Sequence, residues 1–186
     1  MIGQQLDRRY RIVRVLGSGA FGQTYLAADT RRPGMPKCVV KQLCPINNGS
    51  ESLQTAQRLF KQEAETLEKL GEHDRIPRLL AYFEENRQLY LVKEYIPGHP
   101  LTEEIRPGAP LEEEKVINLL RSVLEILEFV HGEGTIHRDI KPANLIRRSE
   151  DDELVLIDFG SVKEISNQLV ASIGAIAPAQ LPVTIL

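Results

Sequence analysis

The chain has 186 residues, of which 42% are hydrophobic and 26% charged, an ordinary composition for one large or two small globular domains. The formal net charge of -3 supplies no general positive field, so nucleic acid is excluded as an expected partner. The two cysteines, Cys38 and Cys44, lack the neighbouring ligands of a metal site, and this pattern favours a reducing, cytoplasmic setting.

The first half of the chain is predicted to consist mainly of β-strands. Apolar and β-branched runs predict strands at 10–16, 24–28, 38–43, 79–83 and 89–95, the last two joined as a hairpin around 84–86. An apolar stripe of helical period predicts a helix over 52–70, which Gly71 ends. The break in composition at 97–100 then marks a candidate hinge.

The second half is predicted to be mostly helical. A short helix is expected at 101–105, and a long one begins at Pro110, with the acids 112–114 in its first turn, where the helix dipole favours them. Residues 116–130 are so rich in apolar side chains that we expect burial on several sides. Short strands are expected at 145–146 and 154–157. The pattern indicates an α+β protein with a β-rich part, 1–96, and a helical part, 97–186.

A glycine-rich segment lies between the first two predicted strands. Gly17, Gly19 and Gly22 match the pattern G-x-G-x-x-G. A dinucleotide-binding fingerprint needs a helix after the glycines, and a P-loop needs Gly-Lys followed by Ser or Thr, so neither motif fits here. Glycines in a hairpin allow a close approach of the backbone to phosphates. A purely structural hairpin turn is the alternative.

Three short strings carry the chemistry. They are His-Arg-Asp-Ile-Lys-Pro-Ala-Asn at 137–144, Asp-Phe-Gly at 158–160 and Val-Lys at 40–41. Together they supply an acidic base, a phosphate-binding lysine and two oxygen ligands for magnesium, which phosphoryl transfer from ATP requires. Their order is typical of a protein kinase catalytic domain. The chain resembles a bacterial, eukaryotic-type serine/threonine protein kinase from about residue 10 to residue 162.

This resemblance implies a two-lobe fold, with an antiparallel β-sheet and one helix in the N-lobe and an incomplete helical C-lobe. It implies transfer of the γ-phosphate of ATP to Ser or Thr of a protein substrate. Asp139 would act on the substrate hydroxyl and Lys141 would neutralise the phosphoryl group, while Asn144 and Asp158 would bind Mg²⁺. The residues assigned to ATP are Leu16, Gly17, Ser18, Gly19, Ala20, Phe21, Gly22, Thr24, Val39, Lys41, Glu63, Glu94, Ile96 and Ile146.

The helix over 52–70 offers two acids as partners for Lys41. Glu63 lies within the apolar stripe, whereas Glu65 lies nearer the charged side of the helix. An acid on a buried face needs a counter-charge, because unpaired burial is expensive. We therefore expect Glu63, in preference to Glu65, to pair with Lys41.

Lys93 takes the position that gates the back of the nucleotide pocket in the family, where an apolar residue is usual. Three possibilities stay open: its side chain reaches toward Glu63, reaches toward the phosphates, or narrows the pocket. The resemblance also implies that the backbone carbonyl of Glu94 and the backbone amide of Ile96 bind the adenine edge.

The resemblance ends before the final apolar stretch. No charged residue follows Glu164, and 169–186 nearly has the length of a membrane-spanning helix. We expect a kinase segment that stops within the domain, with a membrane helix as the less favoured alternative. Ala179 occupies the place of the family's Ala-Pro-Glu glutamate, and Ser161, Ser166 and Ser172 are conceivable phosphorylation sites.

Missing C-lobe helices would leave the apolar faces of 116–130 partly exposed, so we expect low stability or a partner that covers them. A catalytically impaired, ATP-binding pseudokinase or interaction module is then the alternative function. A small-molecule kinase of similar fold is a third hypothesis, against which the catalytic-loop lysine and the glycine-rich segment argue.

Overall fold

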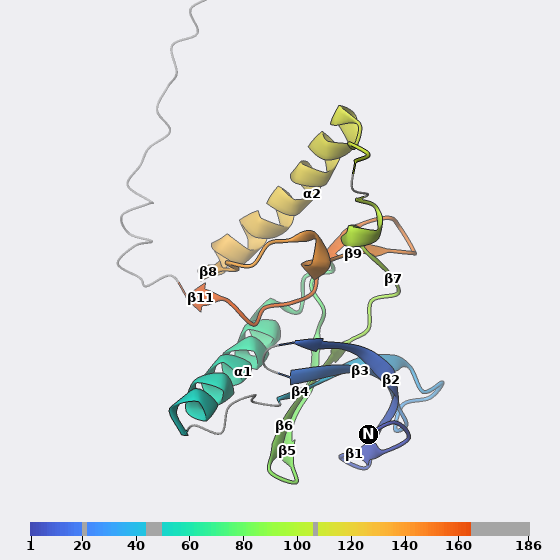
Figure 1. The fold of residues 1–186 in the computed structure, drawn as a ribbon, viewed down its shortest axis with the longest axis vertical. Helices are drawn as coiled ribbons and strands as arrows, with labels where there is room; N and C mark the ends of the chain where they lie inside the picture. Colours follow the sequence, from blue (N-terminus) through green and yellow to red (C-terminus); the bar gives the residue numbers. More distant parts are fainter. Residues whose placement is uncertain (20–21, 44–49, 106–107, 165–186) are drawn as a thin grey trace, which may run out of the picture.

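The computed structural model describes residues 1–19, 22–43, 50–105 and 108–164 (Figure 1). Its lower part in Figure 1 is a sheet with the helix α1, and its upper part carries the helix α2 and several short strands. Some predictions concern positions outside these ranges, namely Ala20, Phe21, Cys44, Ser166, Ser172, Ala179 and the apolar stretch 169–186.

The lower part is built on a six-stranded antiparallel sheet. Its members are β1 (Gln5–Leu6), β2 (Tyr10–Gly19), β3 (Gly22–Asp29), β4 (Lys37–Leu43), β5 (Leu79–Glu85) and β6 (Gln88–Glu94), in the order β1-β2-β3-β4-β6-β5. The hairpin between β5 and β6 turns at Asn86 and Arg87, whose φ angles of 51° and 61° suit a tight two-residue turn. The predicted antiparallel sheet is confirmed, with its hairpin turn slightly later than predicted.

The two faces of the sheet are buried differently because successive side chains of a strand point to opposite sides. One face packs its own core, formed by Leu6, Tyr10, Ile12, Tyr25, Ala27, Cys38, Val40, Tyr90 and Val92. The other face carries Leu91 and Leu43 and packs on α1 (Ser50–Leu70). The register places Val39 and Lys41 of β4 on this second face, opposite Lys93 and Leu91 of β6. The predicted helix over 52–70 is confirmed, and it lies against the face of the sheet that carries Lys41.

Among the described residues, the upper part contains one long helix and short strands. In chain order they are β7 (Gly98–Pro100), the 3-10 turn η1 (Leu101–Glu103), α2 (Glu113–Gly132), β8 (Thr135–Ile136), the 3-10 turn η2 (Pro142–Asn144), β9 (Leu145–Arg148), β10 (Leu154–Leu156) and β11 (Lys163–Glu164). Strands β10, β9 and β7 form one small sheet, and β11 pairs with β8 in another. The short strands at 145–146 and 154–157 are thus confirmed approximately, whereas β7, β8 and β11 were not predicted.

The helix α2 does not begin at Pro110, so that prediction is wrong. Glu112 still has extended backbone angles, φ -61° and ψ 143°, and the first helical residue is Glu113. The φ angle of proline suits extended chain as well as a first helical turn, so a proline alone does not fix the start. Glu113 and Glu114 nevertheless lie in the first turn, where the helix dipole stabilises negative charge.

One side of α2 is apolar and exposed. Val123, Ile126 and Val130 are buried in the core, so burial is restricted to one side of the helix. The exposed fractions are 37% for Val116, 47% for Ile117, 53% for Leu120 and 62% for Leu124. The expected burial of 116–130 on several sides is therefore wrong, whereas the expected partial exposure is confirmed. Within the part of the chain that the structure describes, no helix is long and apolar enough to cross a membrane.

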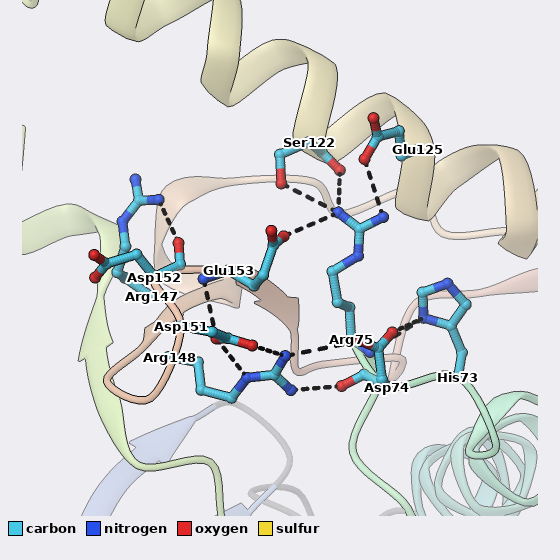
Figure 2. Close-up of polar contacts among 10 residues, drawn as sticks. All are labelled: His73, Asp74, Arg75, Ser122, Glu125, Arg147, Arg148, Asp151, Asp152 and Glu153. Atoms are coloured by element: carbon cyan, nitrogen blue, oxygen red, sulfur yellow. Dashed lines mark hydrogen bonds and ion pairs between the residues drawn. The ribbon is translucent and has the colours of Figure 1, made fainter.

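The loop that follows α1 anchors the sheet to the upper part. Figure 2 shows Arg75 of this loop reaching toward α2 and toward the turn between β9 and β10. Its guanidinium lies 3.1 Å from Glu125, 3.4 Å from Glu153 and 3.3 Å from the hydroxyl of Ser122. The backbone adds a hydrogen bond, since the amide of Leu156 donates to the carbonyl of Arg75 at 3.0 Å.

A second arginine, Arg148 of β9, also connects the upper part to the loop after α1. Arg148 in β9 donates to the carbonyl of Asp74 at 2.8 Å and forms an ion pair with Asp151 at 2.6 Å (Figure 2). Arg75 and Arg148 thus connect, from the two sides, the loop after α1 with the β9–β10 turn. The position of α1 relative to the upper part therefore depends on these contacts.

Arg75→Ala is expected to lower the free energy of unfolding by about 1–3 kcal/mol, because it removes several hydrogen bonds from a charged donor that is mostly buried. Urea denaturation followed by circular dichroism measures this change. Arg121→Ala is the matched control, since the exposed Arg121 bonds to Asn118 of its own helix, and its effect should stay within about 0.5 kcal/mol. Equal losses in the two variants would contradict the anchoring function of Arg75.

Glu104 ties the segment after η1 to β9 and α2. Arg147 donates two hydrogen bonds to its carboxylate, at 2.7 and 3.2 Å, and Lys115 lies 3.2 Å away. The Arg147 guanidinium is the main cause that lowers the pKa of Glu104 from 4.5 to about 2. Because the folded-state pKa is depressed, the stabilisation is complete above pH 4.5 and is lost as the pH falls toward 2.

Glu104→Gln is therefore expected to lower the free energy of unfolding by about 2 kcal/mol at neutral pH and by much less in strong acid. Urea denaturation of both proteins between neutral pH and pH 3 gives the difference at each pH. A difference that stays constant over this range would show that protonation of Glu104 has no part in acid unfolding.

Candidate active site

The structure brings Lys41, Glu63 and Asp158 together from three distant segments. Lys41 Nζ lies 2.6 Å from Glu63 Oε2 and 3.4 Å from Asp158 Oδ1. The predicted pairing of Lys41 with Glu63 is confirmed. Glu65 instead forms an exposed pair with Lys61 at 3.4 Å, so the choice between the two acids is settled for Glu63.

Glu63 is buried because it belongs to the apolar side of α1. Phe60, Ala64 and Leu67 of that side are core residues, and Glu63 itself is only 1% exposed. A carboxylate at this depth requires compensating charge. Burial opposes the charge of Lys41, but the carboxylates of Glu63 and Asp158 outweigh it and raise the pKa of the amine. Burial also opposes the charge of Asp158, but Lys41, Lys93 and the Gly160 amide together outweigh it and lower the pKa of this acid.

Gly160 allows the segment after Asp158 to lie against this group. A β-carbon at Gly160 would stand 3.3 Å from Asp158 Oδ1 and 3.3 Å from Glu63 Oε2, which is tighter than ordinary packing. The Gly160 amide also donates to Asp158 Oδ1 at 3.2 Å. A side chain at this position would therefore displace the carboxylates that face Lys41.

Asp139 is held by two residues of its own loop. Lys141 Nζ lies 2.7 Å from Asp139 Oδ2, and Asn144 Nδ2 donates to the same oxygen at 3.0 Å. The same Nδ2 of Asn144 also donates to the backbone carbonyl of Asp139 at 2.9 Å, and Asn144 is buried at η2. The Lys141 hydrogen bond lowers the pKa of Asp139, so this carboxylate is an ionised acceptor at neutral pH.

His137 packs beneath the loop that carries Asp139, inside the core. It is 1% exposed, accepts a hydrogen bond from the Asp139 amide at Nδ1 and packs edge-on against Phe159 at 5.0 Å. Burial lowers the pKa of His137, which favours a neutral ring that serves packing. Leu67 and Phe159 belong to one core, and Leu79 packs against it.

Arg138 fixes the segment that follows Asp-Phe-Gly. Its guanidinium donates to the carbonyls of Ser161 and Val162 at 2.7 and 3.0 Å, and its own φ is 64°. The sequence did not point to this function, because an arginine beside a charged aspartate carries no signal of which carbonyls it will meet.

The two groups of polar residues are joined through the backbone. The amide of Ile157, the residue before Asp158, donates to the carbonyl of Asn144 at 3.0 Å. The loop that carries Asp139 and Asn144 and the segment that carries Asp158 are thus neighbours. Asp158 offers carboxylate oxygens from a side chain that is 40% exposed, and Asn144 has an amide oxygen on the side opposite its Nδ2 bonds. Oxygen donors of this kind fit Mg²⁺, which usually binds one or two protein side chains together with substrate phosphates.

The residues assigned to the nucleotide lie along β2, β3, β4 and β9. Thr24 stands opposite Gly17 and Lys41 in the sheet, and Leu16 lies at a register shift of β2. Val39 shares the α1-facing side with Lys41, while Ile146 lies in β9.

The glycine-rich turn and the hinge complete this set. Among the described residues, no heavy atom lies within 4 Å of a β-carbon built at Gly17 or Gly19, so space beside the turn is open. Gly19 pairs with Gly22, and Ser18 precedes them in β2. Glu94 ends β6, and Ile96 follows it in the link to β7.

The sheet, the buried lysine–glutamate pair and the two motif segments define a protein kinase fold. A family model described as the protein kinase domain matches residues 10–177, and the chain belongs to this family.

Several relatives carry kinase names. Serine/threonine-protein kinase B from Synechocystis sp. is 46% identical over 180 residues, which is 97% of this chain and 31% of that protein. Serine/threonine-protein kinase PknA from Nostoc sp. is 46% identical over 172 residues, which is 92% of this chain and 30% of that protein. The chain therefore spans about a third of the length of these curated relatives.

A solved structure supports the fold. The crystal structure of the Mycobacterium tuberculosis PknI kinase domain, a C20A_R136A double mutant, superimposes with a TM-score of 0.69 at 26% identity. The match covers 89% of this chain and 64% of that chain.

Proposed function

We propose that the chain forms the nucleotide site and catalytic loop of a Mg-ATP-dependent serine/threonine protein kinase. The observation that carries the proposal is the buried Lys41–Glu63 pair at 2.6 Å with Asp158 beside it. A lysine held in this way offers a fixed positive charge to phosphates, and phosphoryl transfer depends mainly on such positioning and electrostatics.

ATP would lie on the sheet face that carries Thr24, Val39 and Lys41. The adenine would contact Leu16, Val39 and Ile146 and bond to the backbone of Glu94 and Ile96. The phosphates would lie under the glycine-rich segment 17–22 and contact Lys41, which Glu63 orients. Asn144 and Asp158 would hold Mg²⁺, which neutralises charge on the phosphates when bound.

Asp139 would accept the hydrogen bond of the substrate hydroxyl and orient the oxygen toward the γ-phosphate. Its ionised state and its bonds to Lys141 and Asn144 suit this task. Lys141 would then stabilise the negative charge that develops on the transferred group. A lysine two residues after the aspartate, together with the names of the relatives, favours Ser and Thr as acceptors.

The division into an N-lobe, 1–96, and a C-lobe, 97–186, belongs to the same proposal, as does a cytoplasmic location. The exposed apolar side of α2 supports a protein contact there.

The test is transfer of a radioactive γ-phosphate from Mg-ATP to casein, followed by identification of the phosphorylated residues by mass spectrometry. The proposal expects phosphoserine or phosphothreonine that depends on Mg²⁺. Stabilisation of the chain by Mg-ATP without any transfer would contradict a catalytic function and would indicate a binding module instead.

A further inference from the structure

Lys93 is a buried cation beside the proposed catalytic group. It lies in β6 opposite Val39 of β4 and Leu79 of β5, and its side chain is only 9% exposed. An ammonium group at this depth is expensive unless charges or hydrogen bonds compensate it. Its partners therefore indicate what it does.

Two partners face the amine of Lys93. Its Nζ donates a hydrogen bond to the carbonyl of Ile157 and lies 3.8 Å from Glu63 Oε1. That oxygen of Glu63 is buried and has no hydrogen-bond partner in the described part of the chain, whereas Oε2 is bonded to Lys41. Each oxygen of the glutamate thus faces a different lysine.

The two lysines differ in what else they face. Lys41 is also within 3.4 Å of Asp158, so its charge is shared between two carboxylates. When phosphates bind Lys41, its positive charge would be shared with them, and less of it would neutralise the carboxylate of Glu63. Lys93 points to the other oxygen of Glu63 and places a second amine beside it. Burial lowers the pKa of this amine, and the charge of Glu63 is the largest cause that opposes the lowering.

The second contact of Lys93 reaches the metal-binding segment. Ile157 directly precedes Asp158, and both of its backbone polar groups are bonded: its N–H donates to the carbonyl of Asn144, and its carbonyl accepts from Lys93. The one side chain of Lys93 thus connects β6, α1 and the segment that carries Asp158.

We propose that Lys93 is a positioning residue that holds Glu63 of α1 and the peptide before Asp158 in their relative places while Lys41 binds phosphate. The proposal rests on the proposed function of Lys41 and Asp158. Size alone does not account for the contacts, because an apolar side chain of equal length would fill the space and leave Glu63 Oε1 and the Ile157 carbonyl uncompensated.

Lys93→Met tests the proposal, because methionine keeps the length and removes the charge and the donor. Hydrogen exchange of the chain without nucleotide is measured by mass spectrometry. We expect about tenfold faster hydrogen exchange in 60–67 of α1 and in 157–160, because the variant loses roughly one hydrogen-bonded contact. Exchange in β2 and β3 should be unchanged. Unchanged exchange, or uniform acceleration over the whole chain, would overturn the proposal.

Lys93→Gln separates the two contacts and serves if the methionine variant does not fold. Glutamine still offers an N–H to the Ile157 carbonyl but carries no charge for Glu63. We expect faster exchange in 60–67 with protection retained in 157–160. Wild-type exchange in 60–67 would show that the charge of Lys93 does not hold Glu63.

Kinetics provide a readout that a purely structural residue would not give. In folded Lys93→Met, kcat should fall about tenfold while KM for ATP changes little, because Lys93 acts on the alignment of the transferring group and not on nucleotide contacts. If exchange becomes locally faster in Lys93→Met but the wild-type chain transfers no phosphate, the kinase function is refuted and the positioning function of Lys93 stands. Transfer with wild-type kcat in this variant would refute the positioning function alone.

Discussion

Asp139→Asn is expected to lower the rate of phosphoryl transfer by about 10²–10⁴-fold, the usual contribution of a positioned base. Asparagine has the same shape but lacks the negative charge that pairs with Lys141 at 2.7 Å and that, in the proposed mechanism, would accept the hydrogen bond of the substrate hydroxyl. The side chain of Asp139 lies near the surface, so the free energy of unfolding should change little. Initial rates with Mg-ATP and casein measure the effect.

Asp152→Asn is the matched control for this experiment. Asp152 is exposed in the turn between β9 and β10, and its φ of 60° suits asparagine as well as aspartate. Its transfer rate should equal that of the wild type. A wild-type rate in Asp139→Asn would remove Asp139 from the proposed mechanism.

Lys41→Met is expected to reduce transfer to background and to lower the free energy of unfolding by about 2–4 kcal/mol, because a buried pair is broken from one side. The carboxylate of Glu63 would remain at 1% exposure with Lys93 as its nearest cation, 3.8 Å away. Because Lys93 remains near Glu63, the free energy of unfolding should fall less than it would if no cation faced this carboxylate. Urea denaturation and the casein assay give the two effects.

Lys61→Met provides the comparison on the exposed side of α1. Lys61 and Glu65 form an ion pair at 3.4 Å with side chains 66% and 64% exposed, so its removal should cost less than about 1 kcal/mol and leave transfer intact. If the two lysine variants lost equal stability, the buried pair would not be the contact that secures α1.

Much of the site could be predicted because its chemistry is written locally. The motifs at 137–144 and 158–160 are recognised from residue types at fixed spacing. The periodicity of α1 placed Glu63 on the buried side of the helix and Glu65 outside it. The strands followed from alternation and β-branched residues, which report on the two faces of a sheet.

The contacts that hold the parts together could not be predicted in this way. Lys93 meets the carbonyl of a residue 64 positions later in the chain, and a backbone carbonyl carries no sequence signal. Arg75 likewise meets α2 and the β9–β10 turn, which lie 47 and 78 positions later in the chain. The apolar content of α2 predicted burial, but which side of a helix is covered depends on the rest of the fold.

Calorimetric titration of ATP into the chain, with Mg²⁺ and with EDTA, tests most directly that these residues form one magnesium-nucleotide site. The account predicts binding with Mg²⁺, at least about tenfold weaker binding in EDTA, and loss of this difference in Asp158→Asn, which lacks the charged metal ligand. Equal affinity with and without metal, or a metal dependence that survives in Asp158→Asn, would contradict it.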